Sequence, residues 1–116
     1  MSLTTAVFVV AVGFLMVHEL DAIREAEWRF FFPMFDDVVG YWLFTAAHVP
    51  LFALILWFWP DRGFQIGLDV FMVVHLGLHV ALRNHPKIQF KTWFSWVWIV
   101  GAAVLGAVHL AFVLLA

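Results

Sequence analysis

Three side chains that can bind a metal ion follow one another at helical spacing where the first apolar stretch ends. They are His18, Asp21 and Glu25, at positions i, i+3 and i+7. On a helix this spacing places all three on one face. Imidazole and carboxylate groups together suit iron, manganese, zinc or copper, whereas carboxylates alone would suit magnesium or calcium. The motif therefore predicts one wall of a transition-metal site whose other ligands come from elsewhere in the chain.

Histidines in other apolar stretches are the candidates for those ligands. His75 and His79 stand at i and i+4, a spacing that presents two imidazoles to one ion. With a rise of about 1.5 Å per residue, we expect His18, His48 and His75 to lie ~9–12 Å below one membrane face, and His79 ~6 Å below it. The predicted ligands are His18, Asp21, Glu25, His48, His75 and His79, and Asp21 and Glu25 could instead act as acid–base groups.

Simpler interpretations exist for the remaining polar side chains. His109 and Asp69 are expected ~27 and ~21 Å from that face, where they could pair if their helices face each other. A polar contact between helices is the simpler interpretation of His109. We interpret Glu19 and Glu27 as part of a solvated helix end, with Glu19 pointing away from the site, and His85 as a surface histidine. Four histidines in one layer are harder to explain structurally, because ionisable groups are costly in lipid.

The composition indicates a membrane protein. The chain has 116 residues, of which 66% are hydrophobic and 12% are charged, whereas about 25% of the residues in a soluble domain are charged. A membrane span needs about 20 apolar residues, so the length allows four. We predict a single integral membrane domain with spans at about 3–23, 38–59, 64–82 and 92–115. The expected fold is all-α, an antiparallel up–down four-helix transmembrane bundle.

Prolines and polar residues set the expected helix ends. Good helix formers continue beyond the first span, so the first helix should extend past the membrane to about Phe32, before Pro33 stops it. Asp36 or Asp37 is the expected N-cap of the second span. Pro50 should kink that span near His48.

Basic residues predict the orientation. Five of the six Lys and Arg residues flank the face reached by the end of the first span: Arg24, Arg29, Arg83, Lys87 and Lys91. Loops 24–40 and 83–91 should therefore be cytoplasmic, with both termini outside. The chain has no cysteine, which excludes disulfides and thiolate ligands. The expected partner is the lipid bilayer, and no basic patch suggests binding to nucleic acid. Gly63 and Gly67 form a weak small-xxx-small signal for homo-oligomerisation.

A resemblance accompanies the first motif. The string 18–22, His-Glu-Leu-Asp-Ala, followed by Glu25 and the string 27–29, Glu-Trp-Arg, resembles small bacterial four-span membrane proteins of uncharacterised function. It is also distantly similar to the HXXEE membrane family, where a histidine on the first helix is followed by paired acids. Asp21 stands where that motif has its first acid, and Ala22 replaces the second. The resemblance implies a four-helix architecture in a bacterial inner membrane, and no established activity.

Three functional hypotheses follow. The leading one is a metal-dependent membrane enzyme acting on a lipophilic or membrane-accessible substrate, either an oxidoreductase with non-haem iron or a hydrolase with zinc. A di-metal site is favoured slightly, because the ligand set exceeds what one tetrahedral zinc requires. The second is a haem b-binding electron carrier with His48 and His75 as axial ligands, although the acids beside His18 argue against it. The third is a non-enzymatic subunit, proton relay or small transporter.

Overall fold

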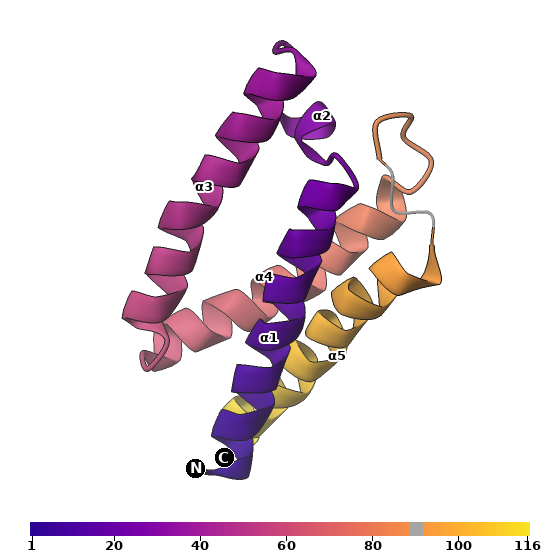
Figure 1. Cartoon of the computed structure of the whole chain (residues 1–116). Helices are drawn as coiled ribbons and strands as arrows, with labels where there is room; N and C mark the ends of the chain where they lie inside the picture. Colours follow the sequence, from indigo (N-terminus) through magenta and orange to yellow (C-terminus); the bar gives the residue numbers. More distant parts are fainter. Residues whose placement is uncertain (89–91) are drawn as a thin grey trace.

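The computed structural model describes residues 1–88 and 92–116, so Lys91 of the predicted cytoplasmic loop lies outside the described residues. The helices are α1 (Leu3–Arg24), α2 (Trp28–Phe31), α3 (Asp37–Phe58), α4 (Arg62–Ala81) and α5 (Trp93–Leu115). Figure 1 shows the four long helices packed together. By length and composition, each of these four could cross a membrane. The predicted all-α four-helix bundle is confirmed, and its four apolar helices indicate an integral membrane protein.

Side-chain caps begin all four long helices. Ser2, Asp36, Asp61 and Thr92 each accept a hydrogen bond from the backbone N–H three residues further on. Such a cap satisfies one of the N–H groups that the first helical turn leaves unpaired. The cap expected at Asp36 or Asp37 is therefore at Asp36. Pro50 lies inside α3, which continues on both sides of it.

The first helix ends at Arg24 and does not continue to Phe32, because the chain turns sharply at Ala26. Ala26 has a φ of 56°, in the left-handed region. Its N–H donates to the carbonyl of Ile23, and the N–H of Glu27 donates to the carbonyl of Ala22. This pair of bonds is a Schellman motif, which closes the helix and redirects the chain. Residues after Glu25 therefore leave the axis of α1 instead of prolonging it.

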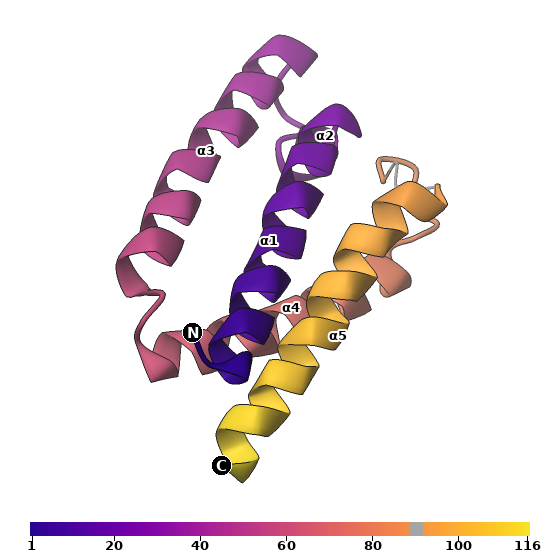
Figure 2. The ribbon, with the colours of Figure 1, turned by 60° about the horizontal axis from the view of Figure 1, so that its bottom comes forward.

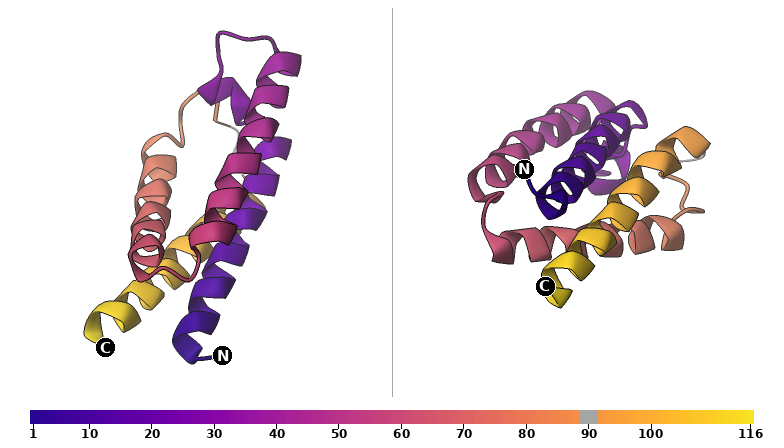
Figure 3. Two further views of the ribbon diagram at one scale, coloured as in Figure 1. Left: turned by 90° about the vertical axis from the view of Figure 1, so that its left-hand side faces the viewer. Right: turned by 90° about the horizontal axis from the view of Figure 1, so that it is seen from below.

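Helix α5 is the element against which both α1 and α4 pack. Two glycines permit the close approach. A Cβ at Gly101 would collide with the ring of Phe14 on α1, and a Cβ at Gly106 would lie 3.0 Å from the Cε of Met72 on α4. Helix α3 touches α1 only lightly and is held at one end by α2. Figures 2 and 3 show α3 standing to one side of the α1–α4–α5 group.

The helix directions bring the polar segments to one end of the bundle. Both termini lie at the opposite end from the α1–α3 and α4–α5 connections (Figure 1). We call the end with these two connections the loop end. The last turns of α1 and α4 reach the loop end, so His18, His75 and His79 meet there.

Candidate metal centre

The centre is built on two turns of α4 and the residue that follows the Ala26 turn. The Nε2 atoms of His75 and His79 lie 3.2 Å apart. Glu27 Oε1 lies 3.4 Å from His79 Nε2. Two ligands of one tetrahedral zinc ion, with bonds of about 2.0–2.1 Å, are about 3.3–3.4 Å apart. Both distances therefore match the spacing of two ligands on a single ion.

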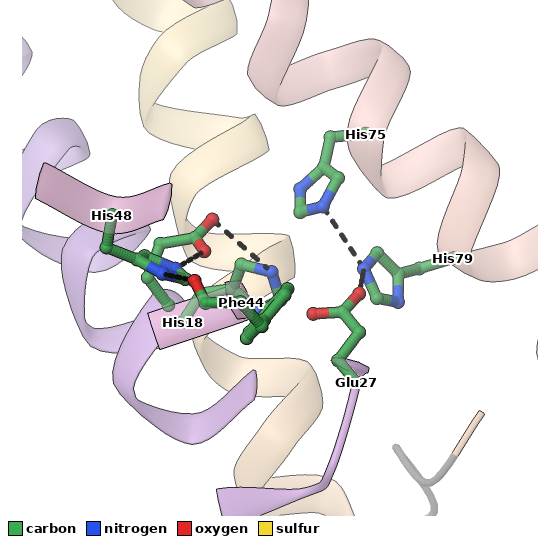
Figure 4. Close-up of polar contacts among 7 residues, drawn as sticks. His18, Glu27, Phe44, His48, His75 and His79 are labelled. Atoms are coloured by element: carbon green, nitrogen blue, oxygen red, sulfur yellow. Dashed lines mark hydrogen bonds and ion pairs between the residues drawn. The ribbon is translucent and has the colours of Figure 1, made fainter. Parts of the chain in front are cut away.

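His18 adds a fourth donor from α1. One donor atom from each of His18, Glu27, His75 and His79 lies within 4.8 Å of all the others. The His18 ring stands nearly edge-on to the rings of His75 and His79, with centroids 4.7 and 5.2 Å apart. Figure 4 shows Glu27 and His79 pointing toward each other beside His75. We call these four side chains the donor cluster.

Glu27 is the member that the sequence did not indicate. Our interpretation of it as part of a solvated helix end is wrong, since the residue is only 6% exposed. Burial, together with the negative charges of Glu19 and Asp21, raises the pKa of Glu27 to about 8. The Ala26 turn brings this carboxyl back to the bundle. No sequence signal marks that turn, because left-handed helix ends usually carry glycine and position 26 is alanine.

Glu19 and His48 form a second polar unit beside the donor cluster. Nδ1–H of His48 donates to the carbonyl of Phe44 over 2.7 Å, and its Nε2 lies 2.6 Å from Glu19 Oε2. Since Nδ1 carries a proton, the Nε2–Oε2 contact holds a further proton, on the ring or on the carboxyl. Glu19 Oε1 lies 4.0 Å from His18 Nε2. The prediction that Glu19 points away from the site is therefore wrong, because it links His48 to the edge of the donor cluster.

A small apolar cavity adjoins the donor cluster. Its volume is about 100 Å³, and Glu27, His75 and His79 form part of its wall. The rest of the wall is apolar: Phe30, Phe31, Leu78, Leu82 and Ile88. A small molecule in this cavity would contact three of the four donors and otherwise only hydrocarbon.

Comparison with known proteins identifies the family of the chain. A family model matches residues 4–116. The chain belongs to the family of unknown function DUF6713. No curated protein and no solved structure matches the chain. Family membership therefore assigns no activity to the chain.

The six predicted ligands separate into two groups. His18, His75 and His79 converge, as the depth argument required. His48 lies nearby but pairs with Glu19. Asp21 is buried, and its Oδ2 makes no hydrogen bond to any described residue; Glu25 is half-buried at the end of α1. Neither acid belongs to the donor cluster found among the described residues, and their roles as ligands or acid–base groups stay predictions.

A separate polar pair lies deeper along α4. His109 Nδ1 is 2.6 Å from Asp69 Oδ2, and the two side chains are 1% and 0% exposed. The sequence predicted this pairing on condition that the two helices face each other, and they do. Asp69 Oδ1 has no hydrogen bond within the described part of the chain. The pair ties α4 to α5 by a polar contact inside the bundle.

Proposed function

We propose that the protein binds one transition-metal ion in the membrane through His18, Glu27, His75 and His79. The observation that carries this proposal is the convergence of four donors from three segments, with three of the side chains buried and His75 half-buried. Placing ionisable groups inside a membrane protein is costly, so such a group marks function by default. Three imidazoles with one carboxylate suit iron or zinc.

We infer further that the protein is a metal-dependent enzyme acting on a lipophilic or membrane-accessible substrate. The support is the cavity of about 100 Å³ that borders Glu27, His75 and His79 and is otherwise apolar. A bound iron would supply redox chemistry, and a bound zinc would activate water for hydrolysis. Four donors suit a single ion. A di-metal site would also need some of the remaining predicted ligands, Asp21, Glu25 and His48.

The contacts of His48 favour a non-haem site over a haem. Both of its ring nitrogens are engaged, one by Phe44 and one by Glu19, so in this arrangement it has no lone pair for haem iron. The cavity of about 100 Å³ is also well below the ~300 Å³ at which pockets for larger ligands begin. The next experiment distinguishes the metal site from two alternatives, a haem carrier and a non-enzymatic membrane subunit, relay or transporter.

Elemental analysis of the purified protein, together with its optical spectrum, tests the proposal. We expect a stoichiometric amount of iron or zinc, which His75→Ala and His79→Ala lose. His85→Ala is the matched control: His85 lies in the α4–α5 connection outside the donor cluster, so this variant should keep its metal. A metal-free wild-type protein, or full metal content in both cluster variants, would refute the metal site. A Soret band would establish the haem alternative.

We also propose a single integral membrane domain in a bacterial inner membrane, with both termini outside and loops 24–40 and 83–91 cytoplasmic. Its support is the basic character of these loops and the place of their described residues at the end opposite the termini (Figure 1). Because the chain has no cysteine, single-cysteine variants report orientation directly. An impermeant maleimide should label Ser2→Cys in intact cells and Lys87→Cys only after permeabilisation. The reverse pattern would invert the topology.

Two finer relationships complete the proposal. His18 and Asp21 support a distant relationship to the HXXEE family. Homo-oligomers could form through the α4 face that carries Gly63 and Gly67, since a Cβ added at Gly67 would meet no atom within 4 Å. Native mass spectrometry should then show a dimer or larger assembly that Gly67→Leu dissociates, and a monomeric wild-type protein would exclude it.

A further inference from the structure

Two hollows follow one another along the seam between α1 and α3. One, of about 390 Å³, lies between residues 8–16 of α1 and 55–59 of α3. The other, of about 260 Å³, lies between residues 19–23 of α1 and 45–52 of α3. On each helix the lining residues recur every three to four positions, so both hollows lie on the same pair of helix faces. We call the two together the α1–α3 groove.

The groove is open to the bilayer and is not filled by the protein. Its rim residues Val49 and Leu56 are 72% and 70% exposed, and α3 packs only lightly on α1. A Cβ added at Gly13, in the groove wall, would meet no atom within 4 Å. From Val9 to Ile23 the groove follows α1 for ~21 Å, more than half of the ~30 Å hydrocarbon core. A single long hydrocarbon chain from the membrane would match this length.

The hollow nearer the loop end contains a polar group that a pure hydrocarbon would not need. Glu19 and His48 form part of its wall, which is otherwise apolar except for Thr45. His48 Nε2 is hydrogen-bonded to Glu19 Oε2. Glu19 Oε1 has no hydrogen bond to any described residue and lies 4.0 Å from His18 Nε2. A carboxyl facing a hollow in lipid is costly unless it meets a polar partner. A hydroxyl group on the occupant would supply that partner by donating to Oε1.

We propose that the α1–α3 groove binds a long-chain alcohol, with its hydrocarbon tail between α1 and α3 and its hydroxyl hydrogen-bonded to Glu19 Oε1. A phospholipid fits less well, because its phosphate would meet the Glu19 carboxyl. The groove lies between α1 and α3, whereas the donor cluster is formed by side chains of α1, α4 and Glu27. The two sites meet only where Glu19 Oε1 lies 4.0 Å from His18 Nε2, so binding of the tail can be measured with or without a metal.

Binding of radiolabelled hexadecanol to the purified protein in detergent micelles tests the tail site. We expect saturable binding to the wild-type protein. Gly13→Leu should weaken it at least about tenfold, because a leucine side chain of several methylene-sized groups would occupy the hollow. Gly77→Leu is the matched control: its Cβ also meets open space, but it lies on α4 outside the groove, so binding should be unchanged.

A second ligand tests the headgroup without changing the protein. Hexadecyl methyl ether has the same chain and cannot donate a hydrogen bond. The wild-type protein should bind it about tenfold more weakly than hexadecanol, the size of one net hydrogen bond to an acidic acceptor. Equal affinity for the two ligands would overturn the assignment of the hydroxyl to Glu19.

Three other results would overturn the proposal. The first is the absence of saturable hexadecanol binding to the wild-type protein, and the second is equal hexadecanol affinity of the wild-type protein and Gly13→Leu. The third is efficient cross-linking between two copies of Gly13→Cys, because it would show that a second copy of the chain fills the groove. Metal content is measured in the same samples. A protein that binds hexadecanol but contains no metal would refute the metal site and leave the alcohol site standing.

Discussion

Glu27→Gln is the substitution that most directly tests how the donor cluster works. Glutamine has nearly the same shape as glutamate but carries no charge and no titratable proton. In the metal-free protein, burial and the charges of Glu19 and Asp21 together raise the pKa of Glu27 to about 8. A metal ion binds the carboxylate form, so binding must remove the proton that the metal-free protein holds.

The size of the effect follows from that pKa. At pH 7, a carboxyl with a pKa of about 8 is protonated in about nine tenths of the molecules, so Glu27 should release about 0.9 proton per metal ion bound. Each pH unit below 8 should weaken the apparent metal affinity about tenfold, or ~1.4 kcal/mol. Affinity should therefore rise with pH up to about 8 and then level off, as far as Glu27 is concerned.

Isothermal titration calorimetry in buffers of different ionisation enthalpy measures the protons released. At pH 7 the wild-type protein should release about 0.9 proton more per metal ion than Glu27→Gln, and the difference should shrink to about a tenth of a proton by pH 9. His85→Ala, outside the cluster, should release as many protons as the wild-type protein. Equal proton release by the wild-type protein and Glu27→Gln at pH 7 would show that Glu27 is not a ligand, or is not held protonated by burial.

The remaining predictions concern stability. Ala26→Gly should raise the free energy of unfolding by about 0.5–1 kcal/mol, because glycine adopts positive φ without strain, and it should keep the metal; a loss of stability would contradict the Schellman turn. Gly101→Ala should lower stability by about 1–3 kcal/mol, since its Cβ would collide with Phe14; an unchanged melting temperature would contradict the α1–α5 packing. Asp69→Leu and His109→Phe should each destabilise the protein by about 1–3 kcal/mol, whereas the double variant should lose much less than their sum; additive losses would show that the pair is not coupled.

The four helices could be predicted from the sequence because the signals that define them act over short stretches of chain. Hydrophobic runs of membrane length, prolines and N-capping side chains act within a few residues of chain, so four apolar helices and the Asp36 cap could be predicted. The pairing of His75 with His79 was predictable for the same reason, because both lie one turn apart on a single helix. Depth along a helix is also local, and it correctly placed His18 in the layer of those two histidines.

The rest of the site depended on tertiary structure. The rise per residue determines how deep a side chain lies in the membrane, but it does not determine how its helix is rotated about its axis. The rotation of α3 turns His48 toward Glu19 instead of into the donor cluster. Glu27 joins the cluster only because Ala26 adopts a left-handed conformation that alanine rarely takes. The sequence alone thus determined which histidines lie at one depth. The packing of α1 and α4 against α5 and one turn after Arg24 decided which acid completes the donor cluster. The packing depends on contacts between segments distant in the chain, and the turn depends on a left-handed alanine that no sequence signal marks.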